Sequence, residues 1–308
     1  MAQTTPNHTQ TVSGWAAHDP SGKITLYTFK RRENGENDVT IKVLYCGICH
    51  TDLHHVKNDW GITTLLSRVG SKGGDRAGVG CLAATCLDCE YCEDAHENYC
   101  DQVQFVYNGI FWDGSITYGG YSEFLVADHR WMQQHRFYVR ELLFSPLKDN
   151  NLLESSGKRI GVVGLGGLGH IAVKFGKAFG HHVTVISTSP SKEKEAKNGL
   201  GADDFILSTN VDQMQAKKRT LDFILDTVSA HHSLGPTLEL LKGRGGEGSM
   251  IGSIKETQEM MDVCGKHNIS CDIEVVRTSE INEALHRLAK NDVKYRFVID
   301  IAGKSSNL

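Results

Sequence analysis

The stretch Arg159-Ile160-Gly161-Val162-Val163-Gly164-Leu165-Gly166-Gly167-Leu168-Gly169-His170 determines how the second half of this 308-residue chain folds. Its apolar run ends in glycines with G-x-G-x-x-G spacing, and the apolar residues that follow recur at helical intervals. The pattern predicts a strand, a tight turn and a helix. In such a turn Gly164 permits the bend, Gly166 lets a pyrophosphate approach bare backbone, and Gly169 lets the helix pack close to its strand.

The same turn is a candidate dinucleotide site. The free N–H groups and the dipole of a helix N-terminus favour an anion at that place. We therefore predict that a dinucleotide contacts the six turn residues, which are Gly164, Leu165, Gly166, Gly167, Leu168 and Gly169. A βα turn with a purely structural role is the alternative, because glycines are common in any tight turn.

The end of the next expected strand indicates which dinucleotide binds. A carboxylate that would bind the ribose of NAD is expected about 20 residues beyond the glycines, but the sequence there reads Ser187-Thr188-Ser189-Pro190-Ser191-Lys192. Hydroxyls and a lysine can bind a 2′-phosphate, whereas a carboxylate would repel it. We predict NADP rather than NAD, bound through Ser187, Thr188 and Lys192. Alternatively, these residues only cap the following helix.

Strands and helices alternate along the second half of the chain, which predicts a parallel α/β domain. The expected strands are 159–163, 182–186, 204–207 and 221–226, and a later helix places Ile281, Leu285 and Leu288 on one face. The first half is mostly β. It has an expected strand from Val39 to Cys46 and expected hairpin turns at Asn108-Gly109 and Asp113-Gly114.

Four cysteines, Cys86, Cys89, Cys92 and Cys100, follow C-x2-C-x2-C-x7-C spacing. Four thiolates can close a tetrahedral sulfur shell, which suits a structural zinc without an open coordination position. An iron–sulfur cluster is an alternative, although Asp101 stands where a proline usually follows. Unliganded cysteines are the third possibility. The total of nine cysteines is odd, which argues against a fully paired disulfide scaffold.

Charge and hydropathy limit the kinds of molecule that this chain is expected to bind. The net charge is −4, and the sequence has no basic stripe. Neither nucleic acid nor an anionic membrane is therefore favoured as a partner. The residues from Met1 to Pro20 show no signal-peptide pattern, and no run of eighteen apolar residues occurs. We expect a cytoplasmic enzyme that acts on a small molecule.

Several motifs together resemble the zinc-dependent medium-chain alcohol dehydrogenases, and most closely their plant cinnamyl alcohol and mannitol dehydrogenase branch. They are Cys49-His50-Thr51-Asp52-Leu53-His54, the four-cysteine segment, the glycine-rich turn and the ending Tyr295-Arg296-Phe297-Val298-Ile299-Asp300. The resemblance implies a GroES-like β-barrel catalytic domain at 1–148, completed by 270–308. It also implies a doubly wound Rossmann domain that binds NADP at 149–269, and a homodimer.

The resemblance also implies roles for individual residues near the first motif. Cys49 matches the first ligand of a catalytic zinc, and Thr51 matches the hydroxyl that passes the alcohol proton. His54 matches a later member of that proton relay, and Asp52 matches a carboxylate that orients a ligand histidine. In the residues alone, the favoured interpretation of these positions is a loop thiol, a turn hydroxyl, a surface imidazole and a helix cap.

The chain departs from the family pattern at three places. The second catalytic ligand, a histidine in Gly-His-Glu, is missing where the sequence runs from Leu65 to Gly70. The third ligand, a cysteine in Cys-Ala-Gly, is missing between His135 and Phe144. A strand and loop that contact the nicotinamide and lead to the dimer interface are missing at Lys242 to Ser249. Each departure has the character of a lost internal segment.

The favoured function is an NADP-dependent alcohol dehydrogenase or aldehyde reductase acting on cinnamyl-type or monoterpene substrates, in which zinc polarises the carbonyl. We expect slow turnover, because only Cys49 of the three catalytic ligands is matched. His55 or Asp75 could act as a replacement ligand. Two alternatives remain: a non-catalytic zinc-stabilised NADP-binding protein, and a zinc-independent reductase of activated double bonds.

Overall fold

The computed structural model describes residues 10–61, 63, 78–133, 144–229, 232–243 and 252–303. The chain divides into two compact units. Unit 1 comprises Met1–Tyr138 together with Asp272–Leu308, and unit 2 comprises Val139–Cys271. Unit 1 is therefore built from both ends of the chain, and unit 2 is one continuous insertion between them.

In the described part of unit 2, four strands form a parallel sheet with the order β14-β13-β12-β15. The strands are β12 (Arg159–Val163), β13 (His182–Ser187), β14 (Asp204–Leu207) and β15 (Phe223–Asp226). When the strands are numbered along the chain, this order is 3-2-1-4. The first four strands of a doubly wound sheet have the same order. The core strand β12 is buried from Ile160 to Val163, as a strand covered on both faces should be.

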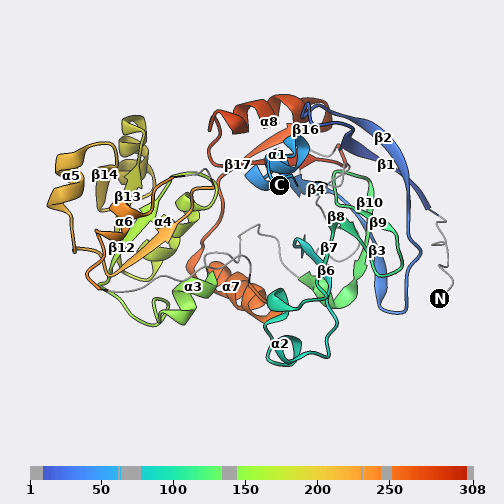
Figure 1. The fold of residues 1–308 in the computed structure, drawn as a ribbon, viewed down its shortest axis with the longest axis horizontal. Helices are drawn as coiled ribbons and strands as arrows, with labels where there is room; N and C mark the ends of the chain where they lie inside the picture. Colours follow the sequence, from blue (N-terminus) through green and yellow to red (C-terminus); the bar gives the residue numbers. More distant parts are fainter. Residues whose placement is uncertain are drawn as a thin grey trace. The chain divides into compact units, whose positions relative to one another are not determined.

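The helices of unit 2 are connected to these strands and are labelled in Figure 1. They are α3 (Phe144–Asp149), α4 (Gly169–Ala178), the 3-10 helix η4 (Pro190–Lys192), the π-helix η5 (Glu195–Gly199), α5 (Val211–Ala216), α6 (Gly235–Leu238) and α7 (Ile254–His267). Ala172 and Phe175, two of the apolar residues that follow the glycines at helical intervals, lie on the buried face of α4. Of the helices in the described parts of the chain, none has the length and apolar character needed to cross a membrane.

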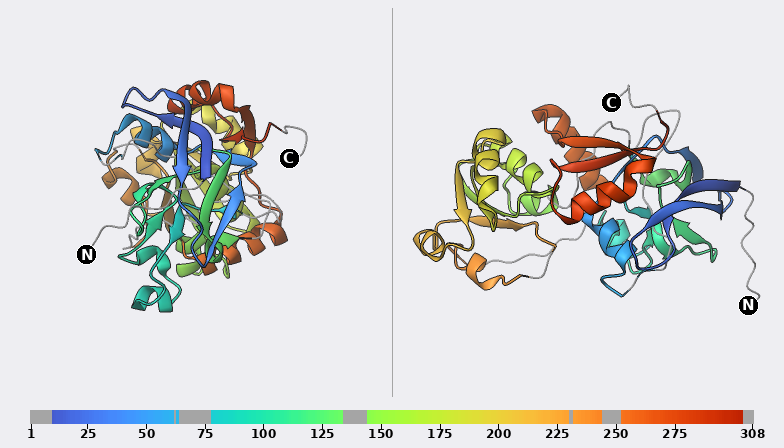
Figure 2. Two further views of the ribbon diagram at one scale, coloured as in Figure 1. Left: turned by 90° about the vertical axis from the view of Figure 1, so that its right-hand side faces the viewer. Right: turned by 90° about the horizontal axis from the view of Figure 1, so that it is seen from above.

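Unit 1 is mostly β and consists of short antiparallel pairs and one mixed sheet. The pairs are β1 (Gln10–Ala17) with β2 (Ile24–Arg31), β3 (Asp38–Lys42) with β10 (Phe124–Asp128), β5 (Gly78–Val79) with β11 (Met132–Gln133), β6 (Leu82–Ala84) with β7 (Gln104–Phe105), and β8 (Tyr107–Ile110) with β9 (Ile116–Tyr118). Figure 2 shows β1 and β2 as a long ribbon.

The mixed sheet of unit 1 joins its two chain segments. It has the order β16-β17-β4, formed by β16 (Ile273–Arg277), β17 (Arg296–Asp300) and β4 (Tyr45–Gly47). The helices of the unit are α1 (His50–Lys57), α2 (Glu90–Glu93), α8 (Ile281–Ala289) and the 3-10 helices η1 (Glu97–Tyr99), η2 (His129–Trp131) and η6 (Thr278–Glu280).

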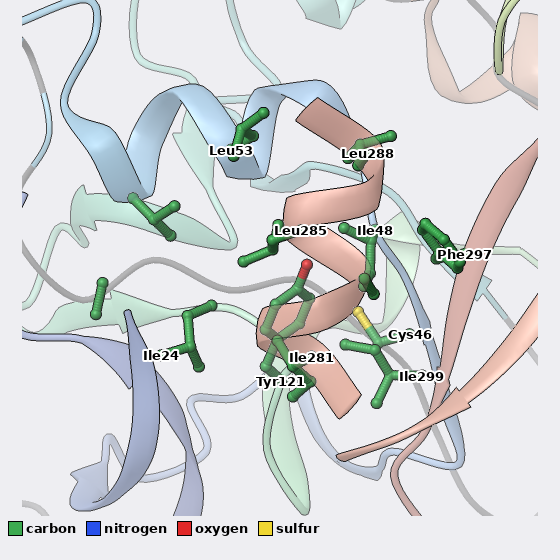
Figure 3. Packing of buried hydrophobic residues seen from close by; sticks show 13 residues of the cluster. Ile24, Cys46, Ile48, Leu53, Tyr121, Ile281, Leu285, Leu288, Phe297 and Ile299 are labelled. Carbon is green, nitrogen blue, oxygen red and sulfur yellow. The ribbon is translucent and has the colours of Figure 1, made fainter. Parts of the chain in front are cut away.

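A hydrophobic core between α1, α8, β4 and β17 fixes this sheet (Figure 3). Leu53 of α1 lies near Leu285 and Leu288 of α8, and Phe297 of β17 is fully buried beside them. Burying a leucine or phenylalanine side chain stabilises a fold by roughly 1.5–3 kcal/mol. The predicted apolar face of the helix with Ile281, Leu285 and Leu288 is therefore its core face.

Two local predictions were wrong. The expected strand from Val39 to Cys46 is two strands, because the chain leaves β10 after Val43 and pairs with β17 from Tyr45 onward. The Asn108-Gly109 pair does not form a hairpin turn. It lies inside β8, where the register with β9 shifts and Asn108 has a φ of 53°. The other expected turn, Asp113-Gly114, does connect β8 with β9.

The carboxylate of Asp203 ties α4 to β13 and predicts a pH-dependent stability. It accepts hydrogen bonds from Lys177 Nζ at 2.7 Å and from the Val183 N–H at 2.7 Å. Burial alone would raise the pKa of Asp203, but these hydrogen bonds outweigh it and hold the pKa below its ordinary value of 3.8. The resulting stabilisation is complete above the unfolded-state pKa and is lost as the pH falls through the folded-state pKa.

We expect Asp203→Asn to lower the free energy of unfolding by about 1–3 kcal/mol at pH 7, because hydrogen bonds to a charged group are lost. The difference between the two proteins should shrink as the pH falls below about 4. Urea unfolding from pH 7 to pH 3 measures this. A difference that stayed constant over that range would contradict the assignment.

Candidate functional site

The glycine-rich turn between β12 and α4 has three glycines with different surroundings. Gly164 has a φ of +85°, which favours glycine, and its N–H donates to the Ile186 carbonyl at 2.9 Å. A Cβ at Gly169 would lie 2.0 Å from the Gly164 carbonyl oxygen, so a side chain there cannot be accommodated. A Cβ at Gly166 would meet nothing within 4 Å. The turn therefore has an open face at Gly166.

The first turn of α4 follows this open face directly. Its N-cap residue is Leu168, and no side chain caps the helix there. The N-terminus of a helix carries a partial positive charge, and its first N–H groups lack partners within the helix. An apolar N-cap beside partly exposed glycine backbone is an arrangement that a phosphate can complete.

The residues expected to bind a 2′-phosphate lie at the carboxyl end of β13, next to this turn. Lys192 Nζ donates to the Leu165 carbonyl at 2.9 Å, so its charge lies on the glycine-rich turn. Partial burial lowers the pKa of Lys192. Ser187 is buried and its hydroxyl accepts from the Ser189 N–H at 3.2 Å, whereas Thr188 is exposed. The structure thus brings Lys192 to the turn and leaves Thr188 accessible.

The four cysteines of the predicted metal site converge in a lobe formed by residues 86–100. Their sulfur atoms all lie within 4.8 Å of one another. Cys86 Sγ lies 3.5 Å from Cys100 Sγ and 3.8 Å from Cys92 Sγ. A tetrahedral zinc with Zn–S bonds of about 2.3 Å would place its sulfur ligands about 3.8 Å apart. The donor set and its spacing therefore fit zinc.

The backbone of this lobe holds the sulfurs in place. Strands β6 and β7 close its base, and Leu87 and Ala95 have positive φ values of 62° and 59° that turn the chain back. The Gln102 N–H donates to Cys100 Sγ at 3.3 Å. Burial raises the pKa of the Cys92 thiol to about 12 when only protein groups surround it. A coordinated cation acts the other way, because it deprotonates a ligating thiol.

The residues expected near a catalytic zinc lie at the N-terminus of α1 in unit 1. Cys49 is the N-cap: its sulfur accepts from the Thr51 N–H at 3.2 Å and lies 3.3 Å from the Thr51 hydroxyl. The Asp52 carboxylate accepts from the Cys49 N–H at 2.7 Å, which completes a capping box.

The same region affects the buried Tyr121. Burial, followed by the charge of Asp52, raises the pKa of Tyr121 well above its ordinary value.

A carboxylate that the sequence analysis missed orients His54. His54 Nδ1 lies 2.9 Å from Asp59 Oδ2, just after α1 ends at an αL residue, Asn58. The ring of His54 packs against Trp60, with centroids 4.8 Å apart. Its Nε2 is buried and has no hydrogen-bond partner among the described residues. Spacing from His54 to Asp59 was the available signal, but five residues do not place two side chains on one helix face.

The three predicted departures lie largely outside the described residues. These are the stretches from Leu65 to Gly70, from His135 to Leu143 and from Arg244 to Ser249. Asp75, one of the two named replacement ligands, also lies outside them. The other, His55, is buried, and its Nδ1 lies 3.3 Å from both Thr63 Oγ1 and Asn108 Nδ2.

Two family sequence models match the chain. The alcohol dehydrogenase GroES-like domain matches residues 35–136, and the zinc-binding dehydrogenase model matches residues 167–291. A protein of Oryza sativa, named probable cinnamyl alcohol dehydrogenase 6, is 55% identical, with 98% of this chain and 99% of that protein covered. The chain belongs to the zinc-binding alcohol dehydrogenases. The predicted resemblance and the prediction of an oxidoreductase are thereby confirmed.

Further relatives of this dehydrogenase agree. A probable mannitol dehydrogenase of Medicago sativa is 46% identical, with 96% of each chain covered. The structure of a cinnamyl alcohol dehydrogenase from Sorghum bicolor matches with a TM-score of 0.89 and 41% identity, covering 96% of this chain and 98% of that one. One from Helicobacter pylori, complexed with NADP(H), matches with a TM-score of 0.83 and 29% identity, covering 95% and 99%. The predicted α/β fold of two domains is confirmed.

The alignment with the Oryza sativa protein also bears on the missing segments. It runs over 363 positions, which is 55 more than the 308 residues of this chain. At least that many aligned positions therefore have no residue here, although the coverage extends over nearly the whole of both chains. This excess agrees with a dehydrogenase that lacks internal segments.

The surroundings of Gly166 and Gly169 predict that substitution by alanine has a different effect at each position. Gly169→Ala should lower the melting temperature, because its Cβ would overlap a backbone oxygen that cannot move independently. Gly166→Ala should leave the melting temperature within about 2 °C of the parent, but it should weaken dinucleotide affinity at least tenfold by blocking the open face. Thermal unfolding and fluorescence titration with NADPH measure the two effects. Unchanged affinity of Gly166→Ala would contradict the predicted site.

Proposed function

We propose that this chain is an NADP-dependent alcohol dehydrogenase that interconverts cinnamyl-type alcohols and aldehydes. The observation that carries the proposal is the agreement between its 55% identical relative and its matching Sorghum bicolor structure, which are both named cinnamyl alcohol dehydrogenases. The relatives also include mannitol dehydrogenases, so mannitol-type alcohols are the second candidate class of substrate. No comparison favours the two alternatives that the sequence leaves open. A homodimer and a cytoplasmic location remain predictions from the sequence.

The proposed cofactor is NADP(H), held by unit 2. Its pyrophosphate would lie on the open face at Gly166 and the N-terminus of α4, and its 2′-phosphate would lie near Ser187, Thr188 and Lys192. Support comes from the position of Lys192 Nζ, 2.9 Å from the Leu165 carbonyl. The Helicobacter pylori relative is a complex with NADP(H). A positive charge on the turn suits a phosphate better than the diol of NAD.

The proposed proton path uses residues of α1 and the loop after it. NADPH, when bound, supplies the hydride that reduces the aldehyde carbon. The Thr51 hydroxyl donates the proton to the alkoxide oxygen, and His54, one turn further along α1, resupplies it. Asp59 fixes the orientation of the His54 ring through Nδ1, which leaves Nε2 as the nitrogen that exchanges the proton.

The structural metal of this dehydrogenase is proposed to be zinc bound by Cys86, Cys89, Cys92 and Cys100. The four sulfurs offer no open coordination position, so this ion stabilises the lobe and takes no part in turnover. The lobe is a polar segment with little buried apolar surface, since α2 contains no buried residue. Coordination is therefore the main source of its stability.

The proposed phosphate site predicts a preference that one substitution should reverse. NADPH should bind more tightly than NADH, because Lys192 is cationic and Ser187 and Thr188 carry hydroxyls. Ser187→Asp should invert the order by repelling the 2′-phosphate and accepting the ribose hydroxyls of NADH. The ratio of the two dissociation constants, from fluorescence titration, is the measurement. Equal affinities in the parent protein would contradict the proposed site.

The reaction itself is tested by NADPH oxidation at 340 nm with cinnamaldehyde. We expect reduction above the protein-free blank, but at least a hundredfold slower than by the Oryza sativa relative assayed in parallel. A metal Lewis acid contributes several kcal/mol of transition-state stabilisation, and about 1.36 kcal/mol corresponds to one decade in rate. Asp59→Asn should slow the residual reaction further without changing NADPH affinity. No reduction above the blank would reject the proposed function.

A further inference from the structure

Among the described residues, those around Cys49 do not form a group of three side chains placed to hold a metal. Cys49, Asp52, His54 and His55 could each bind a metal, but each forms a contact with another residue of the protein. Cys49 Sγ accepts from the Thr51 N–H, and the Asp52 carboxylate accepts from the Cys49 N–H. The imidazole of His54 lies with its Nδ1 2.9 Å from Asp59 Oδ2. These contacts build the N-terminus of α1 and the turn that ends it.

The sequence offers few further ligands for Cys49. No histidine occurs between His55 and His96, and no cysteine occurs between Cys100 and Cys264. A catalytic zinc needs three protein ligands beside its open position. In the part of the chain that the structure describes, the four cysteines of the lobe are the only group of three or more side chains placed to hold a metal.

We infer that this dehydrogenase binds one zinc ion per chain, in the four-cysteine lobe, and that Cys49 serves as the N-cap of α1 without a metal. The inference deepens the proposed function, since it concerns the same site, but it is measured without turnover. The absent second zinc is the physical reason for the slow reduction expected above. A chain that reduced nothing would reject the proposed function and leave the zinc count unaffected.

A cap and a metal ligand respond differently to the same substitution. Serine is among the preferred N-cap residues, because its hydroxyl accepts from the backbone N–H groups of the first turn. If Cys49 is only a cap, Cys49→Ser preserves the hydrogen bond from Thr51 and the capping box with Asp52. If Cys49 binds zinc, the same change removes a ligand and releases the ion.

The test is the zinc content of the full-length protein, purified under reducing conditions and freed of loose metal by gel filtration. Elemental analysis should give one zinc per chain for the parent and for Cys49→Ser, with melting temperatures within about 2 °C. Cys271→Ser is the matched control at a cysteine outside both sites and should also retain one zinc. Cys89→Ser should retain none and should be cleaved by proteases within the lobe.

The parent and Cys49→Ser alone decide the question, even where Cys89→Ser does not fold. Two zinc ions in the parent and one in Cys49→Ser would overturn the inference. One zinc in the parent and none in Cys49→Ser would also overturn it, because the single site would then include Cys49. A parent protein without zinc would overturn the assignment of the lobe.

Discussion

The pairing of β4 with β17 is the interaction on which unit 1 depends. Cys46 lies opposite Ile299 in this antiparallel pair, and the Ile48 N–H donates to the Phe297 carbonyl at 2.9 Å. The strand that leads into Cys49 is therefore held by residues about 250 positions later in the chain. Closing so long a loop costs conformational entropy, which the shared core of α1 and α8 must offset. The position of Cys49 is consequently a property of the folded unit as a whole.

The other two sites of this dehydrogenase are local in sequence. The four cysteines of the lobe lie within the fifteen residues from Cys86 to Cys100, and the glycine-rich turn lies within one βα connection. Such sites form wherever their own segment folds, so the loss of distant segments does not disturb them. A catalytic zinc site assembled from three separate segments has no such protection. This difference in sequence range would allow one chain to keep the two local sites while losing the third, as we propose for this chain.

The same difference decides what the sequence could predict. The strand, turn and helix around Gly164 were predictable because the pattern is local, and the lobe was predictable from cysteine spacing alone. The split of Val39 to Cys46 was not, since the apolar run continues while its hydrogen-bond partner changes from β10 to β17. Asp59 was missed because its approach to His54 depends on the αL conformation of Asn58. The bulge at Asn108 was missed because a turn dipeptide also suits a bulge.

The capping box at α1 shows why the fold can persist without a second metal. A zinc ligand in a preformed site adds binding energy to a backbone that is already ordered, whereas we expect the lobe to gain most of its stability from its metal. The backbone at Cys49 is ordered by three contacts of its own: the Thr51 N–H on its sulfur, the Asp52 carboxylate on its N–H, and the β4 strand that precedes it. Each contact is made by described residues outside the stretches where the other family ligands are missing. The loss of those ligands that we infer would therefore remove the Lewis acid and leave α1, its cap and the His54–Asp59 pair in place.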